Sequence, residues 1–109
     1  MTRRAMLVAV ALSCLVGGGA AAGFWTGNEL LDECQDDPSS PKSLVCRGYI
    51  MGFVDALDWG HSFCSDPGVT AKQFEDVVKF YLRNHPETRH LPAADLVTSA
   101  LKEKFPCGE

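Results

Sequence analysis

Basic residues are scarce in this sequence. The 109 residues hold ten Lys and Arg against fourteen Asp and Glu. From residue 23 onward, eight basic side chains stand against fourteen acidic ones, which gives a net charge of −6. Nucleic acids and anionic lipid surfaces are bound through basic patches, so this balance disfavours both as partners. It suits a soluble protein, or one that docks on a basic protein surface.

Closely spaced cysteine pairs are also absent. The sequence has no C-x-x-C, the ligand pair typical of structural zinc sites. Asp55, Asp58 and His61 share at best part of a helix surface, which is a weak set of metal ligands. A cysteine nucleophile is disfavoured as well, because an oxidising compartment pairs thiols into disulfides. We therefore expect no catalytic residue, no metal and no cofactor, and we predict that the protein is not an enzyme.

The first 22 residues have the parts of a cleavable export signal. Arg3 and Arg4 precede an uncharged stretch that runs from Ala5 to Trp25. A retained membrane anchor is the alternative, because this stretch is nearly long enough to span a bilayer. Its second half is rich in Gly and Ala, which partition weakly into lipid, and this favours cleavage after Ala22. The sequence predicts a signal peptide at 1–22 and one domain at 23–109, exported by the general or the twin-arginine route.

Helix-capping patterns divide the rest of the chain, and no stretch alternates as a strand would. The expected helices begin at the capping box Thr26/Glu29, at Ser40–Pro41, at the capping box Thr70/Gln73 and at Pro92. We expect the first helix to end near Asp37 and the third to stop before Pro86. Glu75 and Lys79 are expected to form an ion pair on the surface of the third helix. The chain is thus predicted to fold as four helices.

Four cysteines follow the leader, and an even number in a short exported chain is typical of a disulfide framework. Four cysteines allow three pairings. Cys34 falls in the last turn of the first expected helix and Cys46 early in the second, both on apolar faces. A short loop between helices makes them antiparallel neighbours, which favours Cys34–Cys46 and leaves Cys64 with Cys107. The predicted fold class is all-α: a compact four-helix domain stapled by two disulfides.

Small residues recur every four positions along the second expected helix, at Gly48, Gly52, Ala56 and Gly60. Glycine inside a helix lowers its stability by about 0.5–1 kcal/mol relative to alanine, so the row suggests a compensating use. Small side chains let another backbone approach closely. The row therefore predicts close packing against either an internal helix or a second copy of the chain.

The stretches "FWTGNELLDEC", "CRGYIMGFVDAL" and "FCSDPGVTAKQFEDVVKFYLRNHPETRHLPAADLVTSALKEKFPC" resemble the Rap/Tai family of type VI secretion amidase-immunity proteins. The resemblance covers residues 24–107 and places all four cysteines. It implies a helical, disulfide-containing periplasmic protein of Gram-negative bacteria, often a homodimer. Its best-studied members bind an exported peptidoglycan amidase and block the amidase's Cys–His active site.

In that family a protruding loop meets the amidase groove, and the corresponding loop here is "NHPETRHLP". Its candidate partner-binding residues are His85, Glu87, Arg89 and His90. A purely structural role is the alternative: His85 would end the third helix, and Arg89 would pair with a nearby carboxylate.

Two functions follow as hypotheses. The first is a periplasmic inhibitor that occludes a cell-wall amidase and has a basic partner surface. The second is a stress or chaperone-like helical module without a toxin partner, opened at acid pH by its three histidines and fourteen carboxylates. Suppression of the aggregation of unrelated proteins would distinguish the second from the first.

Overall fold

Two of the helices begin at reciprocal capping boxes, as the sequence predicts. The Glu29 backbone N–H donates to Thr26 Oγ1 at 3.3 Å, and the Thr26 N–H donates to Glu29 Oε2 at 3.0 Å. The same exchange links Thr70 and Gln73, at 3.2 and 2.7 Å. Each box satisfies backbone donors that the first turn of a helix leaves without partners. The two boxes thus fix where the first and third helices start.

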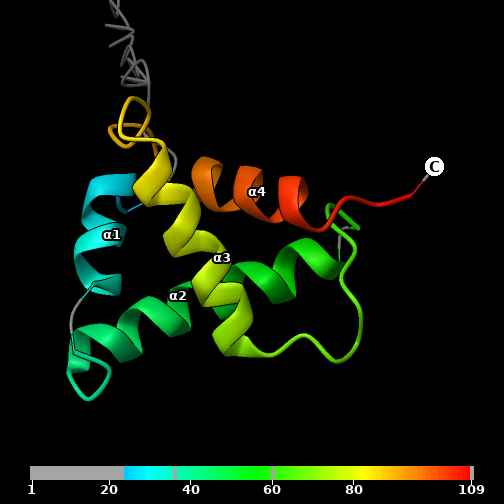
Figure 1. Ribbon diagram of the computed structural model, residues 1–109, viewed down its shortest axis with the longest axis horizontal. Helices are drawn as coiled ribbons and strands as arrows, with labels where there is room; N and C mark the ends of the chain where they lie inside the picture. Colours follow the sequence, from blue (N-terminus) through cyan, green and yellow to red (C-terminus); the bar gives the residue numbers. More distant parts are fainter. Residues whose placement is uncertain (1–23, 36, 60, 109) are drawn as a thin grey trace, which may run out of the picture.

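The computed structural model describes residues 24–35, 37–59 and 61–108, so the predicted signal peptide at 1–22 lies outside the described residues. The described chain folds as four helices, α1 (Gly27–Cys34), α2 (Pro41–Trp59), α3 (Ala71–Asn84) and α4 (Ala93–Lys104) (Figure 1). This confirms the predicted all-α, four-helix class. None of these helices is long and apolar enough to cross a membrane.

The first helix ends earlier than predicted. Gln35 is its C-cap, with a backbone N–H that donates to the Leu31 carbonyl at 3.0 Å. Asp37 instead forms the turn before α2: its Oδ1 accepts from the Ser39 N–H at 2.8 Å and from Ser39 Oγ at 2.7 Å. These backbone and side-chain hydrogen bonds hold the pKa of Asp37 below its ordinary value of 3.8.

The core lies where the four helices meet, and every pair of helices is in contact. Its largest fully buried side chains come from all four helices and from the loop before α3: Leu30, Cys46, Ile50, Phe63, Val78, Leu82, Val97 and Leu101. Leu96 and Ala100 are also buried, as the apolar stripe of α4 predicts. Burial of side chains from every element makes the four helices one packing unit.

Both predicted disulfides are present. Cys34–Cys46 joins the last turn of α1 to α2 with a Cα–Cα distance of 5.0 Å. Cys64–Cys107 joins the loop before α3 to the segment after α4, with a Cα–Cα distance of 4.8 Å. Both distances are within the ordinary range for such bonds. The two bonds therefore cross-link opposite parts of the helical domain.

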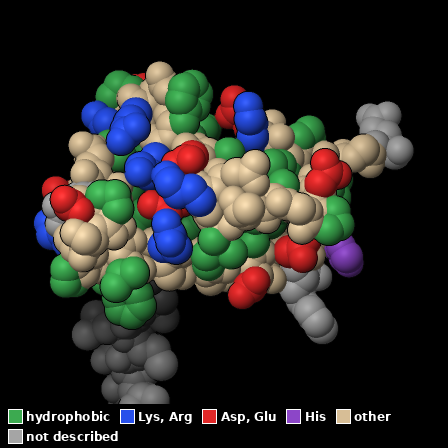
Figure 2. Space-filling model, turned by 60° about the horizontal axis from the view of Figure 1, so that its bottom comes forward, with side chains coloured by type: hydrophobic (Ala, Val, Ile, Leu, Met, Phe, Trp, Pro, Cys, Tyr) green, Lys and Arg blue, Asp and Glu red, His purple; other side chains and the backbone are tan. Residues whose placement is uncertain are grey.

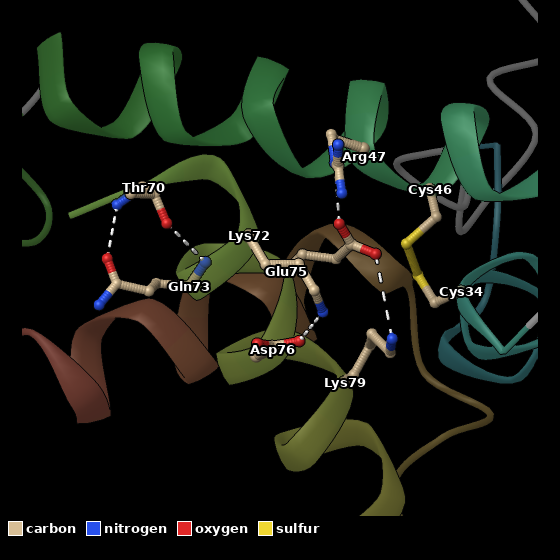
Figure 3. Close-up of polar contacts among 9 residues, drawn as sticks. All are labelled: Cys34, Cys46, Arg47, Thr70, Lys72, Gln73, Glu75, Asp76 and Lys79. Atoms are coloured by element: carbon tan, nitrogen blue, oxygen red, sulfur yellow. Dashed lines mark hydrogen bonds and ion pairs between the residues drawn. A yellow bond between two sulfur atoms is a disulfide. The ribbon is translucent and has the colours of Figure 1, made fainter. Parts of the chain in front are cut away.

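The prediction that Glu75 and Lys79 form a surface pair is wrong in one respect, because Glu75 is buried. Its carboxylate accepts a hydrogen bond from Arg47 Nε of α2 at 3.0 Å, and Lys79 Nζ lies 3.9 Å away (Figure 3). The exposed Lys72 pairs with Asp76 one turn along α3. Figure 2 shows Lys and Arg side chains gathered around acidic ones on one face of the molecule. The pairs Arg47–Glu75 and Lys72–Asp76 each bring opposite charges together within the chain.

The row Gly48, Gly52 and Ala56 lies on the exposed side of α2. A methyl group added at Gly48 or at Gly52 would meet no atom of another segment within 4 Å. The interpretation that an internal helix packs against this row is therefore wrong. Leu44 and Val45, one turn earlier, are also exposed. Packing of a second copy against the row stays a prediction.

Candidate functional site

The loop between α3 and α4, residues 85–92, is fastened at both ends. The Thr88 N–H donates to the His85 carbonyl at 3.2 Å, and the Leu91 N–H donates to the Thr88 carbonyl at 2.9 Å. Three further backbone hydrogen bonds tie the loop region to the start of α1: Gly27 N to Leu91 O at 2.9 Å, Asn28 N to Arg89 O at 2.9 Å, and Ala93 N to Trp25 O at 2.8 Å. An isolated bridge between Thr26 and Pro92 lies among them. The loop therefore has a defined shape.

Gly27 allows this close approach. A Cβ atom there would lie 3.0 Å from the Arg89 carbonyl oxygen and would overlap the side chain of Leu96. Such a contact with backbone cannot be relieved by a rotamer change. The absence of a side chain at Gly27 thus lets the loop sit directly on the first turn of α1.

His85 turns back onto α3 instead of pointing outward. Its Nδ1 lies 2.7 Å from the Tyr81 carbonyl oxygen, and its ring stacks on the Tyr81 ring with centroids 3.9 Å apart. A carbonyl oxygen can only accept, so Nδ1 carries the hydrogen of this bond. His85 is half-buried and closes the C-terminal end of α3, which is the structural role considered from the sequence.

Arg89 is also half-buried and pairs with no carboxylate of the described residues. One terminal guanidinium nitrogen, Nη1, donates to the Leu82 carbonyl at 3.4 Å in the last turn of α3. A positive group at that end interacts favourably with the helix dipole. The Arg89 Nε is buried and has no hydrogen-bond partner within the described chain. The expected ion pair of Arg89 is therefore wrong. Its side chain instead ties the loop to the last turn of α3.

Glu87 and His90 are the outward-facing members of the predicted set. Both side chains are exposed, and neither has a hydrogen bond or an ion pair to any described residue. The structure thus divides the four candidates. His85 and Arg89 hold the loop, while Glu87 and His90 remain available on its surface.

An apolar groove of about 340 Å³ lies beside this loop, between α3 and α4. It is lined by Asp76, Val77, Phe80, Tyr81, His85, Ala100, Glu103 and Lys104. Phe80 at its edge is 69% exposed, which is unusual for so large an apolar side chain. His85 belongs to both the groove and the loop, so the two form one continuous surface. We call the loop 85–92 and this groove the α3–α4 surface.

Phe80 is not among the residues predicted from the sequence. The buried stripe of α3 runs through Phe74, Val78 and Leu82, and Phe80 points away from it. Its neighbours one turn away, Asp76 and Asn84, are polar and exposed. A lone aromatic residue on the polar side of an amphipathic helix is the pattern that would have identified it.

The chemistry of the α3–α4 surface suits binding. An apolar hollow next to an exposed aromatic side chain, with charged groups at its rim, is the usual form of a recognition site. Among the residues with described positions, no group of three or more His, Cys, Asp or Glu side chains is placed to hold a metal ion. The four cysteines from residue 24 onward are all in disulfides.

Comparison with known proteins identifies the family of this chain. No curated protein sequence matches the chain. The sequence model for the family described as Rap1a immunity proteins matches residues 26–107, from the first helix cap to the last disulfide. This span includes all four helices, both disulfides and the whole α3–α4 surface. The chain therefore belongs to the family of Rap1a immunity proteins.

Proposed function

We propose that this immunity protein binds an exported peptidoglycan amidase, the effector, and covers the groove that holds the amidase's active site. The observation that carries the proposal is the family match over residues 26–107. An immunity protein acts by binding a secreted effector. The amidase is the target that the sequence resemblance implies. Inhibition by occlusion requires a pre-formed surface and no chemistry of its own, so the protein is not an enzyme.

The α3–α4 surface is the proposed contact with the effector. Phe80 provides a large side chain that loses little conformational entropy on binding, and the groove beside it accepts a side chain from the partner. Glu87 and His90 lie on the adjoining loop, where they would contact polar groups of the effector at the edge of the interface. His85 and Arg89 act indirectly, by fixing the loop through α3.

Charge supports a basic partner. Arg47 of α2 and Lys72 and Lys79 of α3 all pair with carboxylates of this chain. Asp76, which lines the groove, is one of these paired carboxylates. At the α3–α4 surface, Glu87 and Glu103 are exposed and have no ion-pair partner among the described side chains. With a net charge of −6 from residue 23 onward, the protein attracts a basic surface and associates faster at low salt.

Export to the periplasm is part of the proposal. Residues 1–22 have the composition of a signal peptide, which leaves 23–109 as the immunity domain. Two disulfides in a chain of this size are typical of an oxidising compartment. A peptidoglycan amidase acts in that same compartment. Inhibitor and target would then meet where the damage occurs.

A homodimer is also proposed, with a second copy packed on the exposed face of α2. Gly48, Gly52 and Ala56 leave backbone accessible there, and exposed Leu44 and Val45 extend the face by a turn. In an isologous contact the same row on two copies would allow close helix–helix approach. The α3–α4 surface is built from other helices, so each protomer keeps its own.

Recovery of the partner tests the function directly. The tagged protein is isolated from the periplasm of its own cells, and co-purifying proteins are identified by mass spectrometry. We expect one stoichiometric cell-wall amidase, whose peptidoglycan hydrolysis stops when the immunity protein is added at equal concentration. Hydrolysis of peptidoglycan by the immunity protein alone would contradict the assignment as a non-enzyme. Recovery of many unrelated clients, without an amidase, would instead support the chaperone-like hypothesis.

A further inference from the structure

The two disulfides differ sharply in their access to solvent. Cys34 and Cys46 are 2% and 0% exposed, within the core between α1 and α2. Cys64 and Cys107 are both exposed and lie outside the helices. Thiol–disulfide exchange requires a thiolate to reach a sulfur atom, so access decides which bond reacts. An incoming thiol reaches Cys64–Cys107 in the folded protein but reaches Cys34–Cys46 only after the core opens.

The exposed bond holds a definite piece of structure. The segment after α4 passes beside the loop before α3, where the Cys64 N–H donates to the Phe105 carbonyl at 2.8 Å. The Phe105 ring lies against Phe63 and Phe74, with centroid distances of 6.2 and 5.3 Å. Phe63 is 1% exposed. The Cys64–Cys107 bond thus keeps the chain after α4 in place as a cover over this aromatic cluster.

We propose that Cys64–Cys107 is a site of reversible thiol–disulfide exchange, open to dithiol reductants in the native protein, while Cys34–Cys46 stays oxidised. A thiolate of the reductant attacks one sulfur, a mixed disulfide forms, and the other cysteine leaves as a thiolate that takes a proton from water. The second thiol of the reductant then attacks the mixed disulfide and releases the first cysteine. Two electrons pass to the protein, and the reductant becomes a disulfide.

Reduction has a local consequence. The segment from Phe105 onward is then held by the backbone hydrogen bond of Cys64, by the bond from the Phe105 N–H to the Leu101 carbonyl at 2.8 Å, and by the packing of one half-buried ring. Such a terminal segment opens readily once its covalent tie is gone. The four helices and the Cys34–Cys46 bond remain, because neither depends on residues 105–108 for its main contacts. The inference is independent of the effector, since it concerns the chain alone.

Alkylation under native conditions tests the proposal. The folded protein is exposed to rising concentrations of dithiothreitol, quenched with iodoacetamide and analysed by peptide mass spectrometry. We expect Cys64 and Cys107 to be labelled about tenfold faster than Cys34 and Cys46, which serve as the internal control. Simultaneous labelling of all four, earlier labelling of Cys34 and Cys46, or no labelling until the protein is denatured would each overturn the proposal.

Trypsin gives a second, structural readout. Cleavage after the exposed Lys104 separates residues 105–109, but in the oxidised protein the disulfide keeps that peptide attached. We expect reduction to accelerate this cleavage about tenfold and to release the peptide. A Cys64→Ser/Cys107→Ser variant should show the fast cleavage without reductant. Unchanged cleavage after selective reduction of the native protein would overturn the proposed cover, whether or not that variant folds.

Discussion

Arg47 on α2 donates a hydrogen bond from its Nε to the Glu75 carboxylate on α3 at 3.0 Å, across 28 positions of sequence. The Glu75 side chain is only 5% exposed, whereas Arg47 remains about half in solvent. Lys79 adds a second positive group at 3.9 Å. A carboxylate buried beside two cations is stabilised by them, and its removal leaves both cations without their partner. The contact thus fixes how α2 and α3 meet.

Replacing Glu75 should weaken the fold more than replacing its exposed neighbour. We expect Glu75→Ala to lower the free energy of unfolding by about 2 kcal/mol, because it leaves an unfilled space and two unpaired cations between helices. Asp76→Ala removes only the exposed pair with Lys72 and should cost less than about 1 kcal/mol. Urea denaturation of both variants measures the difference. Equal losses of unfolding free energy in the two variants would show that the buried Glu75 contact stabilises the fold no more than the exposed pair does.

The same Gly→Ala change should have opposite effects at two helical positions. In Gly27→Ala the new methyl group meets the Arg89 backbone and the Leu96 side chain, so we expect a loss of about 1–3 kcal/mol. Gly52→Ala meets nothing and should raise stability by about 0.5–1 kcal/mol through helix propensity. Hydrogen exchange at the Asn28 amide, which bonds to Arg89, should accelerate only in Gly27→Ala. If Gly27→Ala left the stability unchanged, the close contact between the loop and the first turn of α1 would be contradicted.

Asp37 should titrate below its ordinary pKa of 3.8, because the Ser39 backbone N–H and hydroxyl both stabilise its charged form. A lowered folded-state pKa means that the stabilisation is present above the unfolded value and is lost as the pH falls through the folded value. Ser39→Ala removes the hydroxyl and keeps the N–H. The pKa of Asp37 should then rise toward 3.8 without reaching it. A carboxyl-carbon NMR titration of both proteins checks this, and an unchanged pKa would refute the hydroxyl's role.

Phe80→Ala should separate binding from stability. Its side chain is largely exposed, so the free energy of unfolding should change by less than about 0.5 kcal/mol. Binding to the proposed amidase should weaken by about tenfold to a hundredfold if Phe80 is an anchor. Phe80→Tyr keeps the ring and should bind nearly as the native protein does. Calorimetric titration gives both affinities. Unchanged binding by Phe80→Ala would move the interface away from the groove while leaving the immunity function intact.

The proposed dimer can be tested on the outer face of α2. Gly52 is exposed, and a Cβ atom added there meets no atom of another segment within 4 Å, so we expect Gly52→Trp to fold. It should block approach of a second backbone and shift the protein to a monomer in size-exclusion chromatography with light scattering. Gly52→Ala is the matched control and should keep the native oligomeric state. A dimer that persists in Gly52→Trp would place the contact on another face.

Local chemistry explains which parts of the fold could be predicted. Thr26 and Thr70 begin helices because their capping boxes are complete within four residues of sequence. Cys34–Cys46 follows from a short loop between two helices. Asp37 misled the prediction of where α1 ends, because its hydrogen bonds to Ser39 compete with helix continuation.

The features that sequence did not reveal depend on which face each helix turns toward its neighbours. Glu75 adjoins the apolar stripe of α3, and its burial is stabilised by Arg47 from α2 together with Lys79. Gly48 and Gly52 face outward because the other helices pack on the far side of α2. The groove beside Phe80 exists because α4 covers α3 incompletely. None of these is fixed by residues that are close in sequence.

The pairing of residues 25–27 with residues 91–93 sets the order in which the molecule can be assembled. In the proposed export by the general route, the amino end leaves the channel first, so α1 emerges before residues 91–93, which pair with its start, have appeared. Cys46 follows Cys34 by 12 positions, so that bond can close early, whereas Cys64 must wait 43 positions for Cys107. Oxidation should therefore proceed from the short loop to the long one. The start of α1 can therefore pair with residues 91–93 only late in folding, and the Cys64–Cys107 bond forms last.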